Sequence, residues 1–183
     1  MKKTVLTYGL ISGVMISVLM GGSMLFADKI GSGHSMALGY TIMVASFLLI
    51  YFGIRNYRDN TLLGEISFGR AFACGILITL ITCVCYVAMW EVLYFNFMSH
   101  FMDSYFAAQI HTVQSAGLDS ATTAARIAAI QHSQQLYQNP LINIAYTFIE
   151  PLPVGLVITV ISAAFLRRKA PTTSNSSADP ALA

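Results

Sequence analysis

The chain has 183 residues, of which 56% are hydrophobic and only 10% are charged, and its formal net charge is +2. Ordinary soluble domains carry about 25% charged residues, so this composition argues against a soluble fold. The small net charge, without a dense run of basic residues, also argues against a nucleic-acid partner.

Long apolar stretches dominate the chain, and each approaches or exceeds the roughly 20 residues that a helix needs to cross a bilayer. Four such stretches are present, at residues 4–27, 36–54, 71–95 and 141–166. The first is longer than the apolar segment of a signal peptide, which has about 7–15 residues, so we expect it to be retained. The pattern predicts an all-α polytopic membrane protein with four transmembrane helices in a lipid bilayer.

Basic residues are distributed unevenly around these predicted spans. One set flanks the ends that would lie on the same side of the membrane: Lys2, Lys3, Arg55, Arg58, Arg70, Arg167, Arg168 and Lys169. The opposite side has only Lys29 and Arg126. Because cytoplasmic flanks are enriched in Lys and Arg, we expect both termini to be cytoplasmic.

Residues 96–140, between the third and fourth spans, are the only sizeable polar segment. Their apolar residues recur at helical spacing, and Gly117 interrupts the pattern. Asp119 suits the N-cap of a second helix, which Asn139–Pro140 would end. We therefore expect an extracytoplasmic helical hairpin, although its first helix could instead lie in the headgroup zone.

Residues 1–169 are expected to form a single transmembrane domain. The remaining residues, 170–183, are rich in Ser, Thr, Pro and Ala. Such a composition cannot bury enough apolar surface to fold, so we predict a disordered cytoplasmic tail.

Small residues at intervals of four mark three of the predicted spans. They are Gly9, Gly13, Ser17 and Gly21 in the first span, Gly75 and Thr79 in the third, and Gly155 and Thr159 in the fourth. Small residues at this spacing let helix backbones approach closely in lipid. We expect these faces to pack helices together, and the chain to form a homo-oligomer or to bind other membrane proteins.

Glu150 is the first candidate for a functional residue, because a carboxyl group inside a transmembrane span is costly and marks a functional site by default. Pro151 and Pro153 lack amide hydrogens and should open the helix near Thr147. Broken helices build proton and cation sites in transporters, and Glu91 on the third span could contribute. The alternative is a proline kink in which Glu150 has a purely structural hydrogen bond.

Metal binding and catalysis have weaker support. His34, His100, His111 and His132 all fall on the predicted outer side, where His100, Asp103 and His111 could share one helix face. Their spacing matches no compact metal motif, so we expect no metal and no cofactor. The sequence also lacks a phosphate-binding loop and a nucleophile elbow, so we expect no enzymatic activity.

Three short motifs resemble an uncharacterised bacterial membrane family, domain of unknown function 4199. They are Gly53-Ile-Arg-Asn-Tyr-Arg-Asp-Asn, Ser67-Phe-Gly-Arg-Ala-Phe and Phe148-Ile-Glu-Pro-Leu-Pro-Val-Gly-Leu. The resemblance covers about residues 4–169 and implies a four-span protein of a bacterial cytoplasmic membrane. In the cytoplasmic loop it emphasises Tyr57, Arg58, Asp59, Phe68 and Gly69. It assigns no activity to them, and that loop could be a partner site or simply a solvated loop that sets orientation.

The sequence therefore favours an integral membrane protein without enzymatic activity, acting as an accessory or regulatory subunit. The alternative is a small proton- or cation-coupled transporter that uses Glu150.

Overall fold

The computed structural model describes residues 1–25, 32–97 and 101–168. Within these ranges the chain is helical and contains no strand. The helices are α1 (Lys2–Leu25), α3 (Ser32–Thr61), α4 (Phe68–Phe97), α5 (Phe101–Ser115), α6 (Ser120–Tyr137), α7 (Pro140–Ile149) and α8 (Leu152–Leu166). The all-α fold class is confirmed. His100, Lys169 and the predicted tail lie outside the described residues.

Within the described residues, four helical segments are long and apolar enough to cross a membrane. They are Lys2–Ser23, Ala37–Thr61, Phe68–Asn96 and Pro140–Leu166. The second and third extend beyond the apolar stretches from which they were predicted. Polar residues at a membrane surface can continue a helix, and in α3 the pair Arg55–Asp59 supports the last turns at i,i+4 spacing with 3.6 Å between Nε and Oδ2.

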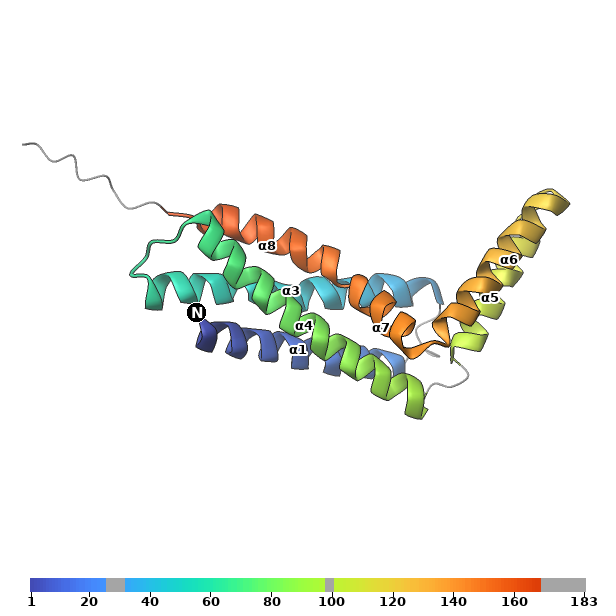
Figure 1. Ribbon diagram of the computed structural model, residues 1–183, viewed down its shortest axis with the longest axis horizontal. Helices are drawn as coiled ribbons and strands as arrows, with labels where there is room; N and C mark the ends of the chain where they lie inside the picture. The colour runs from blue at the N-terminus through green and yellow to red at the C-terminus, as the bar shows by residue number, and fades with distance from the viewer. Residues whose placement is uncertain (26–31, 98–100, 169–183) are drawn as a thin grey trace, which may run out of the picture.

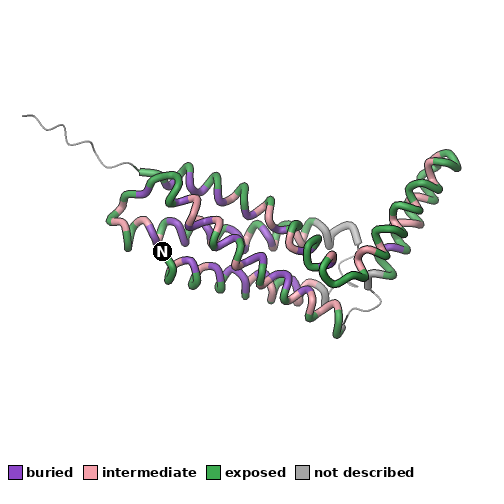
Figure 2. The backbone as a smooth tube through the Cα atoms, viewed as in Figure 1, coloured by how far each residue is buried: buried purple, intermediate pink, exposed green. Residues whose placement is uncertain are grey.

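The spanning helices form one bundle, with α1 and α8 each packed against both α3 and α4 (Figure 1). Its core includes Ile16, Phe47, Ile50 and Ile78, which are fully buried. Large apolar side chains also cover the outside, as Phe165 shows with 81% of its surface exposed. Figure 2 shows buried positions along the inner faces and exposed positions along the outer ones. An apolar exterior is what lipid requires of a transmembrane bundle.

The small residues of α1 bring it close to α4. A Cβ atom added at Gly13 would meet Cys85 Sγ at 2.6 Å, and one added at Gly9 would meet Ile81 at 2.9 Å. One turn further along, the Ser17 hydroxyl donates to the Cys85 carbonyl at 3.4 Å. Gly21 continues the row, where an added Cβ would lie 3.0 Å from a methionine methyl group of α4.

The same packing joins α4 to α8. A Cβ added at Gly75 would meet the Thr159 methyl group at 2.8 Å, and one added at Gly155 would collide with the Thr79 methyl group. The hydroxyls of Thr79 and Thr159 lie 3.0 Å apart. These small-residue faces are therefore occupied by the chain's own helices, so assembly with another chain would have to use a different surface.

Helices α5 and α6 lie side by side and project from one end of the bundle (Figure 1). The turn between them places Gly117 at a φ of 65°, which is favourable for glycine. Asp119 caps α6 as predicted, because its carboxylate accepts a hydrogen bond from the Thr122 amide at 2.9 Å. Gln134 donates to Asp103 across the two helices at 3.2 Å.

The cap of α6 should make its first turn sensitive to pH. Hydrogen bonds from the side chain and backbone of Thr122 hold the pKa of Asp119 below its usual range. A carboxyl whose pKa is lower in the folded state stabilises that state above the unfolded pKa and loses this effect as pH falls through the folded pKa. We expect amide hydrogen exchange at Thr122 and Thr123, corrected for the intrinsic pH dependence, to show less protection in acid.

Two variants isolate the charge of Asp119 from its geometry. Asp119→Asn keeps a capping oxygen, so its protection should be nearly independent of pH. Asp119→Ala should lose protection at every pH. Equal protection in all three proteins would contradict the cap's contribution.

Candidate functional site

The predicted break in the last span is confirmed. Helix α7 ends at Ile149 and α8 begins at Leu152, because neither Pro151 nor Pro153 can donate a backbone hydrogen bond. At 1.5 Å per residue, Glu150 lies about 15 Å from the start of α7. A span that entered the hydrocarbon core at Pro140 would carry Glu150 to about the middle of its roughly 30 Å thickness.

Glu150 is held by Tyr86 of α4. The buried Tyr86 hydroxyl donates to Glu150 Oε2 at 3.1 Å. Glu150 as a residue is nevertheless exposed on the surface of the bundle. The carboxyl group thus contacts α4 while part of the residue faces outward, toward what would be lipid or a neighbouring helix.

Asn143 lies on the same side of α7, one turn before Thr147 and about two turns before Glu150. It is fully buried, and its Oδ1 accepts hydrogen bonds from Trp90 Nε1 and from the Thr147 hydroxyl, both at 3.2 Å. These two donors determine the orientation of the amide. Its Nδ2 is also buried and has no hydrogen-bond partner within the described residues, although buried amide donors are normally paired.

Aromatic rings continue this group of side chains toward α5 and α6. The rings of Trp90 and Tyr94 stack with centroids 6.2 Å apart, and Tyr94 meets Tyr137 edge-on at 6.0 Å. Tyr137 in turn contacts Phe106 of α5 with a centroid distance of 6.4 Å. We call the polar and aromatic side chains between α4 and α7 the α4–α7 seam; its members are Tyr86, Trp90, Tyr94, Tyr137, Asn143, Thr147 and Glu150.

Glu91 does not join Glu150 by a hydrogen bond. Its Oε1 is buried without a partner in the described part of the chain. Tyr86 and Trp90 are four residues apart and share a helix face, whereas Glu91 is five residues from Tyr86 and points in another direction. Glu150 pairs with a tyrosine of α4 instead of the predicted second carboxyl group.

Of the other predicted site residues, Thr147 joins the seam through Asn143, Pro151 is buried, and Pro153 is exposed.

The sequence analysis did not predict Asn143 and Tyr86 as site residues. A signal for Asn143 was available, because it precedes Thr147 by four residues and Glu150 by seven. For Tyr86 there was no such signal, since its contact depends on how α4 packs on α7.

The predicted loop motif forms a structural tie at the other end of the bundle. Arg58 Nε contacts Asp59 Oδ1 at 2.6 Å, and its guanidinium donates to the Leu166 carbonyl at the end of α8 at 3.5 Å. Nearby, Ile66 and Arg168 exchange two backbone hydrogen bonds of 3.1 and 2.9 Å. Asp59, and not Glu65, is the acidic partner of Arg58 within the described residues.

The remaining motif residues have different surroundings. Tyr57 is buried in the core, and Phe68 stacks on Phe72 with centroids 6.1 Å apart. An added Cβ at Gly69 would meet open space. These contacts give Tyr57 and Phe68 a packing role and leave the purpose of Gly69 unexplained.

Two further features lie away from the seam. Among the described residues, no three His, Cys, Asp or Glu side chains are grouped closely enough to hold a metal ion, and His100 of the predicted histidine face lies outside them.

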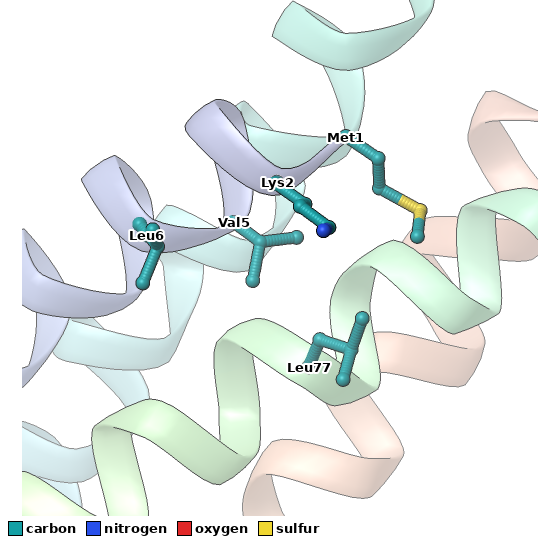
Figure 3. Close-up of a pocket in the computed structure, with 5 residues that line it drawn as sticks. All are labelled: Met1, Lys2, Val5, Leu6 and Leu77. Carbon is teal, nitrogen blue, oxygen red and sulfur yellow. The ribbon is translucent and has the colours of Figure 1, made fainter.

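A shallow cavity of about 240 Å³ lies between α1 and α4 near the N-terminus (Figure 3). Its lining consists of Met1, Lys2, Val5, Leu6 and Leu77, and none of these belongs to the predicted site.

The fold is that of a multi-pass helical membrane protein, with a carboxyl group at the break in its last apolar span. A family model described as "Protein of unknown function (DUF4199)" matches residues 7–168. The chain belongs to this family, as its motifs indicated. No curated protein and no solved structure gives a significant match.

Proposed function

We propose that this protein is a non-enzymatic accessory or regulatory subunit of a larger assembly in the bacterial cytoplasmic membrane, with both termini in the cytoplasm. The supporting observation is the position of Glu150, which is near mid-span and exposed on the surface of a single chain. A carboxyl group that faces lipid is expensive, and Tyr86 contributes a hydrogen bond to only one of its two oxygens. A neighbouring transmembrane helix covering Glu150 would remove that cost.

The surface around Glu150 is suited to such a neighbour. Tyr146, Ile149 and Val157 are 56%, 59% and 56% exposed and flank the break on α7 and α8. An apolar surface with one central polar group can associate in lipid through van der Waals packing and a hydrogen bond between helices. The partner would be a second copy of the chain or another membrane protein.

The proposed orientation follows from the basic residues at one end of the bundle. The N-terminus, the end of α3, the start of α4 and the end of α8 lie together there (Figure 1), and these segments contain Arg55, Arg70 and Arg167. Positive charge near span ends favours the cytoplasmic side. Reporter fusions at residue 183 should therefore be active only in the cytoplasm; an exported reporter would contradict this orientation.

Photo-crosslinking in intact membranes tests the proposed assembly. A photoreactive amino acid at Ile149 should give one discrete crosslinked species, because that position adjoins Glu150. The matched control is Val18, which is 63% exposed but lies on α1. A crosslinked band from Ile149 and none from Val18 supports the assembly, and its mass shows whether the partner is a second copy. Only uncrosslinked chain at Ile149 would contradict it.

A proton- or cation-coupled transporter is the second candidate, and the Tyr86–Glu150 pair at a broken helix favours it. In proteoliposomes with an imposed pH gradient, such a protein should carry a substrate-dependent proton flux. Glu150→Gln should abolish that flux, while Glu91→Gln should leave most of it. Equal flux through the wild type and Glu150→Gln would exclude this use of Glu150.

A further inference from the structure

We propose that Glu150 is a one-sided proton-binding site: it exchanges protons along the α4–α7 seam with the compartment that contains α5 and α6, and is closed to the other side. This inference holds for either proposed function, because it concerns only which side of the membrane reaches the carboxyl group. The sequence suggested that Glu150 binds either a proton or a cation. The inference specifies a proton and the route by which it reaches Glu150.

The outer half of the route is lined by groups that form hydrogen bonds. Tyr137 lies where α6 ends, next to Tyr94, and the Trp90–Asn143–Thr147 cluster follows one turn deeper. Below it, Tyr86 donates to Glu150. Polar groups therefore continue from the end of the bundle that bears α5 and α6 to the middle of the membrane.

Asn143 is the most informative residue on this route. Its Oδ1 accepts two hydrogen bonds, yet its Nδ2 is buried without a partner in the described chain. A buried amide donor left unpaired is destabilising. A water molecule accepting this hydrogen bond would offset the cost, and it would lie between the outer end of the seam and Glu150, where a proton relay requires one.

The inner half of the bundle is closely packed, and the threonine hydroxyls next to the break there already form hydrogen bonds. Immediately beyond the break, Gly155 contacts the Thr79 methyl group, and Phe47 lies 3.0 Å from where its Cβ would be. The Thr79 hydroxyl donates to its own helix at the Gly75 carbonyl, 3.0 Å away, and lies 3.0 Å from the hydroxyl of Thr159. All these side chains are fully buried, and their hydrogen bonds are already made. Protons are therefore expected to be blocked here.

The surroundings of Glu150 select a proton over a metal ion. Calcium requires six to eight oxygen ligands, and magnesium about six. Among the described residues, the Glu150 carboxylate meets a tyrosine hydroxyl that donates to it, and it is not grouped with two further His, Cys, Asp or Glu side chains. A single carboxyl group with a tyrosine donor suits a proton better than a divalent metal ion.

Few titratable groups face this carboxyl group. Tyr86 and Cys83 on α4, and Tyr137 beside α7, are the ones that interact electrostatically with Glu150 or with its partner Tyr86. The described residues of α8 include no titratable side chain. A change in labelling at Glu150 with pH can therefore be attributed to this carboxyl group or its tyrosine partners.

Carbodiimide labelling tests the route in the full-length protein. A membrane-permeant carbodiimide reacts with protonated carboxyl groups in the membrane, and peptide mass spectrometry measures the adduct at Glu150. The protein is reconstituted in vesicles, and the pH is set separately on each side. Ser120→Cys, labelled with a membrane-impermeant maleimide, identifies the side that bears α6.

Labelling of Glu150 should follow the pH on the side of α6, falling about tenfold per pH unit above its titration midpoint, and should ignore the pH on the other side. Thr147→Val, which removes one hydroxyl and keeps the shape, should slow this response several-fold. Ser162→Ala in the inner half is the matched control and should leave it unchanged.

Three results would overturn the inference: labelling that follows the opposite side, labelling that follows both sides equally, and no labelling of Glu150 at any pH. Each differs from failure of the proposed functions, because a missing crosslink at Ile149 or a missing flux leaves the sidedness of labelling unaffected. Size-exclusion profiles matching the wild type show that the variants remain folded.

Discussion

Replacing Gly155 by alanine should destabilise the bundle more than its single added methyl group suggests. The new Cβ would collide with the Thr79 methyl group and lie 3.0 Å from Phe47 Cε1, and both neighbours are fully buried. Extra methylene groups in a well-packed core cost about 1–3 kcal/mol. Thermal unfolding in mild detergent, followed by circular dichroism, should show a lower Tm.

Gly39→Ala is the matched control. A Cβ at Gly39 of α3 would meet nothing within 4 Å, and alanine favours a helix over glycine by roughly 0.5–1 kcal/mol. Its Tm should therefore stay equal to that of the wild type or rise. If both substitutions lowered the Tm equally, the effect at Gly155 would not come from the close approach of α4 and α8.

Trp90→Ala should cause the second large effect, because it removes the centre of the α4–α7 seam. Trp90 is only 8% exposed, stacks on Tyr94 and donates to Asn143. Replacing a buried tryptophan by alanine costs about 3–5 kcal/mol in soluble cores. In lipid we expect the lower part of that range, because the solvent is itself apolar. Chemical unfolding in mixed detergent micelles measures the loss.

Two further variants separate the ring of Trp90 from its N–H group. Trp90→Phe keeps most of the packing and loses the hydrogen bond to Asn143, so it should lie between the wild type and Trp90→Ala. Phe95→Ala removes a ring that is 59% exposed on the same helix and should change stability little. Equal effects of Trp90→Ala and Phe95→Ala would contradict the proposed role of the seam.

The candidate site was only partly predictable. Glu150 and the helix break were predicted, because a carboxyl group and two prolines inside an apolar stretch are conspicuous in any context. The partners of Glu150 were not. Tyr86 looks like an ordinary aromatic residue of a span, and Glu91, which carries the more obvious chemistry, points away from the Tyr86 face of α4.

The small-residue faces illustrate a second limit. Spacing of four residues predicts close packing, and the structure bears this out at Gly13 and Gly155. The same spacing cannot distinguish packing within a chain from packing between chains, since both bury one helix face in the same way. Here α4 occupies both faces, and this moves the expected interface to the surface around Glu150.

By itself, the sequence determined that this protein consists of apolar helices of bilayer-spanning length, that the last of these is broken at Glu150, and that the basic residues gather at one end. Those properties depend on composition and on covalent chemistry within short segments. Only the tertiary structure decided that Tyr86 holds Glu150, that Asn143 is buried with an amide donor unpaired within the described residues, and that Thr79 and Thr159 pair on the other side of the break. Such contacts join residues more than fifty positions apart, so they depend on which helix faces meet, and no local pattern specifies that.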